Sequence, residues 1–572
     1  MDVLTQPQSQ EEVVMTNYPV GMDNFVEQVL SPGATWSPST TEPSTPDTIT
    51  RMHPAHSPQP SPNNISFPSS PVGNQYATPQ IGQLQWALFV TNSGTHVNGL
   101  SHGEPTTPTE CIAQIHRSCI DQAHLLSTMM QQLKMLLNSP SQQGYDSMLA
   151  LQHRLKSQID QELQKLQVLN RDIILSPRDL QMLFNLHQDL QIQLKQLELL
   201  YHELQSLVNG NMNNCYCSLI VTKQPFPEVF KNGCTLPDDS LVVQMLTGSN
   251  VDIVNVGPVK ASLVSDGNHG SAKKDKLVNN QAHLDNSKCA KFPLKLNLST
   301  RKQSVVLKFS VKVHLRNKQG QVANVTIESL PSLPFVVITN ESQWEDSMQI
   351  LFKKDTFNGK LEIPWPQLCN TLQRHFLRAT KQDLMNPKRH LNAYDFKYIN
   401  ERFFDSKSRI TNRDFEKFWA WFGKCLHVVR YKRHIGSLWQ QGLIYGFMSR
   451  DVVRASLDGQ KVPGTFVIRF SEQYPGQFGI AYIGANSQQV KHYLVGANDV
   501  AGPRKTLPDF LAQHPQFLYI LQVTFTGAGK PVFKRYPKDQ CFAPYYSPYV
   551  SQRRPKGDGY DPLEAPRVKP HM

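Results

Sequence analysis

Residues Gly464–Glu472 read GTFVIRFSE, and this stretch decides the fold of the C-terminal part of the chain. From Phe466 to Phe470 successive side chains would point to opposite faces, as they do in a strand of a packed sheet, which puts Arg469 beside Val467. Arginine is rarely buried without a partner, and its planar set of donors suits a phosphate. The pattern therefore indicates either an arginine that binds an anion or one that is ion-paired inside a sheet.

The elements around this strand favour the first alternative. A short helix beginning near Ser449 precedes it, and the strands FGIAYIG and VKHYLVG and the segment TLPDFLAQHPQFLYIL follow it. Helix, three strands and helix is the order of an SH2 domain, and GTFVIRFSE resembles the signature strand and loop of that domain. VKHYLV resembles the strand beneath the phosphotyrosine. The resemblance implies phosphotyrosine-binding roles for five residues: Arg469, Arg450, Ser471, Glu472 and His492.

Composition sets limits on the rest of the chain. With 572 residues and a mass of 64.9 kDa, it should hold about three to five domains. A net charge of +12 favours a polyanionic partner, without separating DNA from RNA or a membrane surface. The nine cysteines are scattered, as in a reduced intracellular protein. No signal peptide and no membrane span are expected, because no apolar run approaches about 20 residues.

The N-terminal half divides into two parts. Residues 1–105 are rich in Pro, Ser, Thr, Gln and Asn, so we expect them to be disordered. Residues 106–210 should form three long helices, two of them announced by Thr107 and by Ser176 as N-caps. The last helix repeats leucine every seven residues, which favours an antiparallel helical bundle and also fits a dimeric coiled coil. Its glutamine-rich opposite faces are interpreted as solvated surface.

Two more regions separate this bundle from the SH2-like part. Residues 211–345 contain short β-rich runs separated by Gly, Asn and Pro, which predict a β sandwich. Its basic loops either bind phosphates or only keep the domain soluble. Residues 346–436 should be a helical linker domain whose many Trp and Phe side chains form its core. We expect no metal in it, because it contains no calcium loop of the D-x-D-x-D-G kind.

Taken in order, these regions resemble a STAT transcription factor, similar to the shorter non-animal members of that family. LPFVVITNESQ resembles the end of the STAT DNA-binding domain, IYGFMSRD resembles the junction between linker and SH2 domain, and GDGY resembles the segment of the activating tyrosine. The resemblance implies a multidomain fold: a coiled-coil bundle, an immunoglobulin-like β-sandwich DNA-binding domain, a helical linker, an α+β SH2 domain at 437–548 and a phosphotyrosine tail at 549–572.

The resemblance also assigns functional residues. It implies DNA contacts by Lys231 in FKNG and by Asn340 in ITNES, and phosphorylation of Tyr560 by an upstream tyrosine kinase. Three other tyrosines lie nearby, but Tyr560 follows a Lys-Gly-Asp-Gly stretch that should be open to a kinase. One departure concerns the pocket itself: Gln473 and the Tyr-Pro-Gly that follows replace the serine-rich loop typical of the family.

The expected function follows from these assignments. The chain should be a transcription factor that forms a phosphotyrosine-dependent homodimer, binds a palindromic site in double-stranded DNA and moves from cytoplasm to nucleus on activation. The alternative is a cytoplasmic SH2 adaptor that does not bind DNA. No cofactor is expected, and an enzyme is disfavoured. The segment around Lys530 lacks the first glycine and the Ser or Thr of a P-loop.

Overall fold

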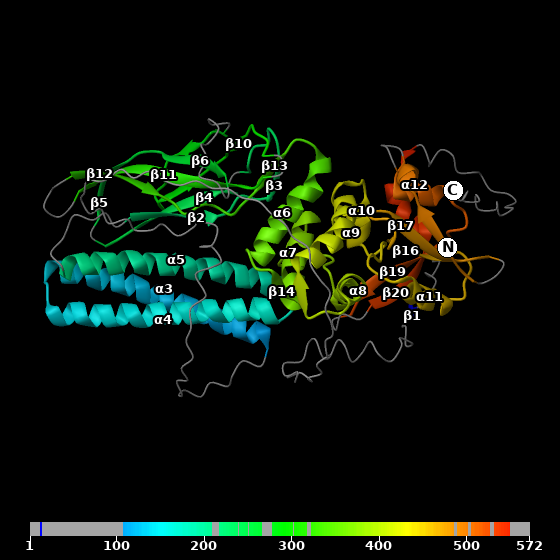
Figure 1. The fold of residues 1–572 in the computed structure, drawn as a ribbon, viewed down its shortest axis with the longest axis horizontal. Coiled ribbons are helices and arrows are strands. Elements are labelled where there is room, and N and C mark those ends of the chain that lie inside the picture. Colours follow the sequence, from blue (N-terminus) through cyan, green and yellow to red (C-terminus); the bar gives the residue numbers. More distant parts are fainter. Residues whose placement is uncertain are drawn as a thin grey trace, which may run out of the picture.

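The computed structural model describes residues 12–13, 107–208, 217–237, 239–249, 251–265, 277–300, 303–316, 322–485, 489–500, 505–526 and 531–548. The described part is elongated (Figure 1): a helical bundle and a β domain lie side by side at one end, helices fill the middle, and an α+β domain forms the other end. The segments predicted to be disordered (1–105) and to carry the tail tyrosine (549–572) lie outside the described residues, apart from the strand β1 (Glu12–Val13).

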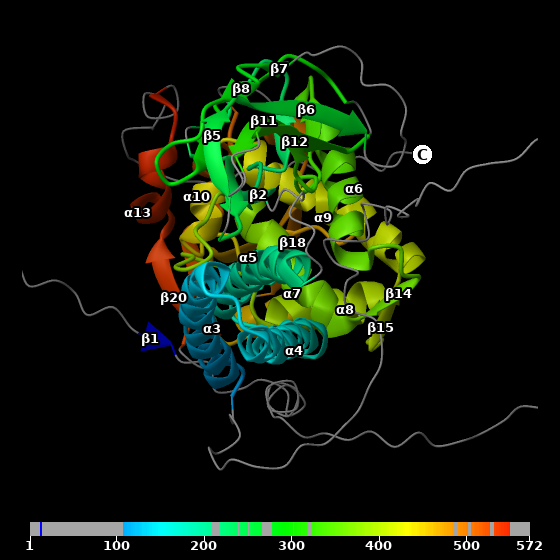
Figure 2. The ribbon, with the colours of Figure 1, turned by 90° about the vertical axis from the view of Figure 1, so that its left-hand side faces the viewer.

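The bundle consists of three helices of 31 or 32 residues each: α3 (Pro108–Asn138), α4 (Gln142–Asp172) and α5 (Pro177–Val208). Thr107 and Glu110 form a capping box at the start of α3, and the Ser176 hydroxyl accepts a hydrogen bond from the Asp179 amide at the start of α5. Both predicted N-caps are therefore confirmed. Connections of three or four residues make neighbouring helices antiparallel, and Figure 2 shows α3, α4 and α5 packed side by side, viewed nearly along their axes.

The leucine repeat of α5 faces the interior of the bundle. Its four leucines are buried: Leu183, Leu190, Leu197 and Leu204. Burial also lowers the pKa of His187, one residue of the same stripe, to about 4. The described helices thus form a bundle within one chain.

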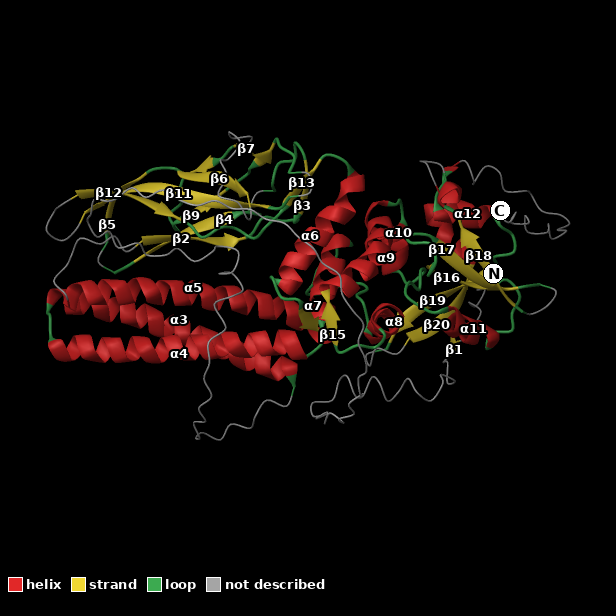
Figure 3. Cartoon of the chain, in the orientation of Figure 1, coloured by secondary structure: helices red, strands yellow, loops and turns green. Residues whose placement is uncertain are grey.

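Part of the glutamine-rich surface of α5 is not solvated, in contrast to the expectation. The side-chain amides of Gln188 and Gln196 donate to the backbone carbonyls of Thr222 and Thr247 in the β domain. The reason is that an amide side chain can satisfy strand-end carbonyls where a helix lies along a sheet. These bonds join the β domain to the bundle, and Figure 3 shows the β domain lying along α5.

Twelve short or medium strands make up the described β domain. They are β2 (Cys217–Lys223), β3 (Val229–Lys231), β4 (Val242–Thr247), β5 (Asp252–Val256), β6 (Val259–Ser265), β7 (Leu277–Val278), β8 (Gln281–Ala282), β9 (Cys289–Lys291), β10 (Lys295–Leu296), β11 (Val305–Arg316), β12 (Val322–Glu328) and β13 (Val336–Ile338).

The strands of the β domain are arranged around one core. One sheet has the order β12-β11-β6-β8, with β5 also on β11, and another has the order β2-β4-β9. The long strand β11 alternates buried and more exposed residues from Leu307 to Arg316, so one face of its sheet covers the core. Two further pairs, β10-β7 and β13-β3, form separate two-stranded sheets that contribute to the same core. The predicted β sandwich is confirmed.

The helical linker is built from two similar halves. The first comprises the 3-10 turn η1 (Glu341–Gln343), α6 (Trp344–Phe357), β14 (Glu362–Pro364) and α7 (Trp365–Ala379). The second comprises α8 (Ala393–Phe404), β15 (Arg409–Thr411) and α9 (Asn412–Tyr431), and α10 (Ile435–Gln440) follows. The strands β14 and β15 pair antiparallel through Ile363 and Ile410, which joins the halves.

The C-terminal domain has a central sheet flanked by helices. Its elements are α11 (Arg450–Asp458), β16 (Thr465–Phe470), β17 (Phe478–Ile483), β18 (Val490–Val495), η2 (Ala497–Val500), α12 (Leu507–Gln513), β19 (Tyr519–Phe525), β20 (Pro531–Pro537), α13 (Lys538–Phe542) and η3 (Ala543–Tyr545). The sheet order is β1-β20-β19-β16-β17-β18. The expected helix, three strands and helix are present, and the hairpin β19-β20 was not identified from the sequence.

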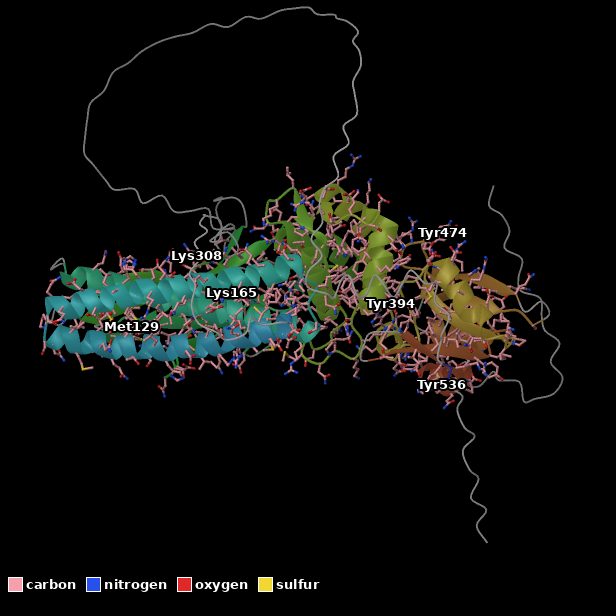
Figure 4. The ribbon with its side chains drawn as sticks, turned by 90° about the horizontal axis from the view of Figure 1, so that it is seen from below. Met129, Lys165, Lys308, Tyr394, Tyr474 and Tyr536 are labelled. Carbon is pink, nitrogen blue, oxygen red and sulfur yellow. The ribbon has the colours of Figure 1, made fainter. Side chains whose placement is uncertain are left out.

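One hydrophobic core runs without a break from the linker into the C-terminal domain. Phe466, Ile468 and Phe470 belong to this core, whereas Val467 faces a smaller cluster on the other side of the sheet. The expected alternation along β16 is therefore confirmed. Figure 4, seen from the side of the bundle, shows the linker helices between the bundle and the C-terminal domain. A shared core makes the linker and the C-terminal domain one mechanical unit.

Candidate phosphate-binding site and nucleic-acid interface

Arg469 is held in the middle of the C-terminal sheet. It lies opposite Gly479 of β17, and its side chain is 4% exposed. The segment before α11 runs along the same strand, because Tyr445 donates to the Ile468 carbonyl (2.8 Å) and Phe470 donates to the Gly446 carbonyl (2.9 Å). The backbone around Arg469 is thus fixed from both sides, so the guanidinium has a defined position.

The guanidinium of Arg469 is only partly satisfied. Its Nη1 donates to the Phe470 carbonyl at 3.0 Å and lies 3.4 Å from Oε1 of Glu472. Its Nε is buried and has no hydrogen-bond partner among the described residues. Burial lowers the pKa of Arg469, and the charge of Glu472 opposes this effect. A buried cation with an unused donor suits an anion that offers several acceptor oxygens.

Three more basic residues surround Arg469. Arg450 begins α11, Arg454 follows one turn later on the same helix, and His492 lies on β18. Burial lowers the pKa of His492, and the positive charges of Arg469, Arg450 and Arg454 lower it further. The positive charges of the three arginines therefore act together on His492. The sequence identified three of these four basic residues, and the spacing of four residues from Arg450 would have identified Arg454.

Ser471 and Glu472 differ in how they border this site. The Ser471 hydroxyl accepts a hydrogen bond from the Tyr474 amide at 3.2 Å, and its carbonyl accepts one from the Trp421 indole at 2.9 Å. Ser471 thus ties the loop to helix α9 of the linker. The Glu472 carboxylate faces Arg469, so it acts as a counter-ion of the guanidinium, and it would repel a phosphate.

The loop that departs from the family pattern packs against the linker. Gly476 has a φ of 75°, and a Cβ at this position would lie 3.3 Å from both Cβ and the carbonyl oxygen of Lys424. A side chain would therefore be strained as well as crowded. The Tyr-Pro-Gly sequence thus fits a loop that lies on α9, while the Tyr474 ring at its tip is exposed (Figure 4).

The linker also supplies a tyrosine to the edge of the site. Tyr398 of α8 is buried, and burial together with the charge of Glu472 raises its pKa, whereas Arg469 opposes this rise. Its ring centroid lies 6.4 Å from that of Trp421. The sequence gave no signal for Tyr398, because it lies in a different domain about 70 positions before Arg469.

The two residues assigned to DNA contact lie close together in the fold. Lys231 ends β3 and pairs with Ile338 of the parallel strand β13, two residues before Asn340. The Asn232 amide donates to the Ile338 carbonyl at 2.8 Å, which closes this corner. Both side chains are exposed. The structure therefore brings together two polar residues that are more than a hundred positions apart.

An ion pair between domains fixes the strand that carries Lys231. Glu228 precedes β3, and its carboxylate contacts Arg378 of the linker helix α7. Burial alone would raise the pKa of Glu228, but the nearby charge of Arg378 helps to lower it to about 2. In contrast, Lys308 (Figure 4) is paired with Glu328 on the neighbouring strand, so it is less suited to phosphate contact.

In the second half of the linker a lysine lies between two carboxylates. The Lys407 ammonium lies 3.4 Å from Oδ2 of Asp414 and 4.0 Å from Oδ2 of Asp405. The lysine ammonium therefore neutralises two carboxylates of the kind that a calcium ion would use as ligands. In the described ranges we find no group of three His, Cys, Asp or Glu side chains arranged to hold a metal. Likewise, none of the helices described is long and apolar enough to span a bilayer.

Comparison with protein families gives four matches in sequence order. Residues 109–215 match "Dictyostelium STAT, coiled coil", residues 217–338 match "STATa Immunoglobulin-like domain", residues 340–432 match "EF-hand fold domain" and residues 443–504 match "SH2 domain". None of these descriptions is of an enzyme. The matches follow the bundle, the β domain, the linker and the C-terminal domain.

Two curated relatives come from Dictyostelium discoideum. Signal transducer and activator of transcription A is 43% identical over 475 residues, which are 82% of this chain and 66% of the relative. Signal transducer and activator of transcription B is 41% identical over 508 residues, 81% of this chain and 44% of the relative. The chain thus spans about half to two thirds of the length of these relatives.

More distant matches are weaker. Human signal transducer and activator of transcription 4 is 27% identical over 40% of this chain and 33% of its own length. Among solved structures, an inactive choanoflagellate E3 ubiquitin ligase Cbl TKB matches at 16% identity over 30% of this chain and 48% of that chain. Its TM-score is 0.16, so it supports no statement about the fold.

Proposed function

Because this chain belongs to the STAT family, we propose that it is a transcription factor switched on by tyrosine phosphorylation. Phosphorylated Tyr560 of one copy would dock at Arg469 of a second copy, and the reciprocal contact would form a two-fold symmetric homodimer. The dimer would present two β domains to a palindromic site in double-stranded DNA. It would move from the cytoplasm to the nucleus when an upstream tyrosine kinase has acted.

The observation that supports this proposal most is the group of four basic residues around the buried Arg469. A phosphotyrosine carries a charge of about −1.5 to −2 and three strong acceptor oxygens at neutral pH. It would satisfy the unused Nε of Arg469 and receive further charge-assisted hydrogen bonds from Arg450, Arg454 and His492. The bound phosphate would also displace the contact between Arg469 and Glu472.

The corner formed by β3 and β13 supports the second half of the proposal. Lys231 would bind a phosphate of the DNA backbone, and Asn340 would contact a base edge in a groove. The ion pair between Glu228 and Arg378 would hold this corner in a fixed orientation to the linker. Because the linker shares a core with the C-terminal domain, the dimer contact would set the spacing of the two β domains.

The first experiment compares phosphorylated and unphosphorylated full-length chain. We expect phosphorylation to convert a monomer into a dimer in analytical ultracentrifugation and to produce a gel shift with random duplex DNA, whose bound fraction is then sequenced. Tyr560→Phe should abolish both effects, and Tyr549→Phe should leave them intact. Dimerisation without DNA binding would instead identify a phosphotyrosine adaptor.

The second experiment separates the roles of the two DNA residues. Lys231→Ala should weaken binding to all duplexes alike and reduce the slope of log affinity against log salt by about 1. Asn340→Ala should cost about 1–3 kcal/mol on the preferred site and much less on random DNA. Lys308→Ala is the control, because its charge is already paired with Glu328. Unchanged binding by both variants would remove the assignment.

A further inference from the structure

A cavity of about 440 Å³ lies where the linker meets the C-terminal domain. Helix α9 and the residues after it form one wall, and the loop before β17, the end of β18 and the start of α12 form the others. Its volume is in the range of protein sites that hold small ligands or peptide side chains. The cavity is separate from the Arg469 site, since neither Arg469 nor the basic residues around it line the cavity.

The lining combines an apolar interior with a basic rim. Apolar side chains from both domains contribute to it, among them Val428, Ile435, Phe478, Val495 and Leu507. Five basic residues also line it: Lys424, His427, Lys432, Arg433 and Lys505. Glu345 is the one carboxylate among the lining residues. This composition suits an apolar group that is flanked by negative charges.

One lining residue has an unused polar atom. His427 lies 4.0 Å from Glu345 through its Nδ1, whereas its Nε2 is buried and has no hydrogen-bond partner among the described residues. A buried ring nitrogen without a partner is costly, and an occupant of the cavity with a polar backbone or a carboxylate would satisfy it.

The chain contains a segment with matching chemistry directly after Tyr560. Residues 558–564 read DGYDPLE and hold three carboxylates and no basic residue, with Leu563 as their one large aliphatic side chain. Basic residues stand on both sides of this acidic window, from Arg553 to Lys556 before it and at Arg567 and Lys569 after it. The acidic residues of the tail therefore cluster around Leu563.

The described chain ends beside the cavity. The Ser547 amide donates to Oδ1 of Asp509 (2.8 Å), and Oδ2 of Asp509 accepts from the hydroxyl of Thr506, which lines the cavity. The Tyr545 ring packs on His434, between the lining residues Arg433 and Ile435. The 15 residues that follow Pro548, up to Leu563, span up to about 50 Å when extended, so the tail is long enough to reach the cavity.

We propose that this cavity holds residues 561–564 of the same molecule before Tyr560 is phosphorylated. Leu563 occupies the apolar interior, and Asp561 and Glu564 face the basic rim. Tyr560 is then held at the mouth of the cavity, where a kinase reaches it less easily. This resting position needs neither phosphorylation nor a second copy, so it goes beyond the dimerisation proposed above.

Photo-crosslinking in unphosphorylated full-length chain tests the proposal. With p-benzoylphenylalanine in place of Leu563, we expect intramolecular crosslinks to peptides 424–435 and 495–507, with a yield that does not depend on protein concentration. The same probe in place of His571 is the matched control and should crosslink at background level. Crosslinks to α11 and β18 around Arg469, crosslinks only between chains, or none above the control would overturn the proposal.

A second variant checks the role of the rim without changing the tail. Lys432→Glu combined with Lys505→Glu should reduce the crosslink yield by about fivefold, as expected for two exposed charge contacts. The same double variant should speed phosphorylation of Tyr560 by a tyrosine kinase, since the tail is released. Lys353→Glu combined with Lys397→Glu, away from the cavity, should change neither. An unchanged yield in the rim variant would also overturn the proposal.

Discussion

Arg389 and Arg469 are buried to a similar degree, yet their guanidinium groups are used differently. Arg389, 5% exposed, donates to the backbone carbonyls of Trp439, Ile444 and Tyr445, and its guanidinium stacks 3.9 Å above the Trp439 ring. Arg469, 3% exposed, has its own neighbour's carbonyl and one carboxylate. The Nε of each is buried without a hydrogen-bond partner among the described residues, but Arg389 joins the linker to the C-terminal domain through three backbone carbonyls, whereas Arg469 contacts one carbonyl and one displaceable carboxylate.

This difference gives a physical criterion for a binding arginine. Burial costs both side chains hydration, and it lowers the pKa of each, to about 10 for Arg389. At Arg389 the loss is offset by contacts to backbone carbonyls that stay in place. At Arg469 the nearest anion is the partly exposed carboxylate of Glu472, which a ligand can displace. Burial alone therefore does not identify a binding arginine. The two are separated by whether the groups that contact the guanidinium are fixed or can be displaced by a ligand.

The largest effect is expected from removing the structural arginine. Arg389→Met should lower the free energy of unfolding by about 3–5 kcal/mol, because it leaves buried carbonyls without their donor and removes the contact with Trp439. Chemical denaturation followed by tryptophan fluorescence measures this loss. Arg402→Met, on the exposed surface of α8, is the control and should stay within about 0.5 kcal/mol. Equal losses in both variants would show that the carbonyl contacts of Arg389 contribute nothing special.

A pH effect should come from the carboxyl group near Arg389. Burial raises the pKa of Asp395 to about 7 from the ordinary 3.8, while the charge of Arg389 opposes the rise. Between these two values the folded chain holds a proton that the unfolded chain has released, so stability falls as the pH rises. Asp395→Asn should remove about 4 kcal/mol of this fall between pH 4 and pH 7, measured by denaturation at several pH values.

Asp414 provides a control of opposite sign for that measurement. Hydrogen bonds from Thr411 and Lys407 outweigh its burial and lower its pKa, so its contribution is present at neutral pH and is lost as the pH falls. Asp414→Asn should therefore flatten the acid side of the stability curve and leave the window between pH 5 and pH 7 unchanged. If Asp395→Asn behaved in the same way, the raised pKa of Asp395 would be refuted.

Much of the fold could be predicted from local sequence patterns. The period of two in GTFVIRF, the heptad leucines of α5 and the caps at Thr107 and Ser176 depend on neighbours a few residues away, so they can be read from the sequence. The hairpin β19-β20 could not be read in this way. Its first strand follows α12 after only five residues, and its pairing with β16 joins positions more than fifty apart.

The candidate site was likewise predictable only in part, because some of its residues come from distant positions in the sequence. The sequence pointed to Arg469 because an arginine interrupts an apolar strand, but Tyr398 and Trp421 reach this region from another domain. Nothing in their local sequence separates them from ordinary core residues. In the same way, only the tertiary pairing of β3 with β13 explains why Lys231 and Asn340 are neighbours.

Removing the binding arginine should reverse the pattern expected for Arg389. Arg469→Met should weaken binding of a phosphorylated peptide of residues 556–566 by about 100-fold, since charge-assisted hydrogen bonds to phosphate are lost. The free energy of unfolding should change by less than about 1 kcal/mol, because Met fills the space and Glu472 stays hydrated. Isothermal titration and denaturation measure the two quantities. A stability loss as large as that of Arg389→Met would falsify the distinction between the two arginines.

The smallest effect should come from the counter-ion of Arg469. Glu472→Gln removes a negative charge 3.4 Å from Nη1, so Arg469 no longer exchanges one anion for another when the phosphopeptide binds. Because the Glu472 side chain is 21% exposed, screening limits the gain to about two- to fivefold in affinity. The gain should shrink as salt is added, whereas Glu401→Gln on the exposed face of α8 should give none. Weaker binding by Glu472→Gln would mean that Glu472 positions the loop for the phosphate instead of competing with it.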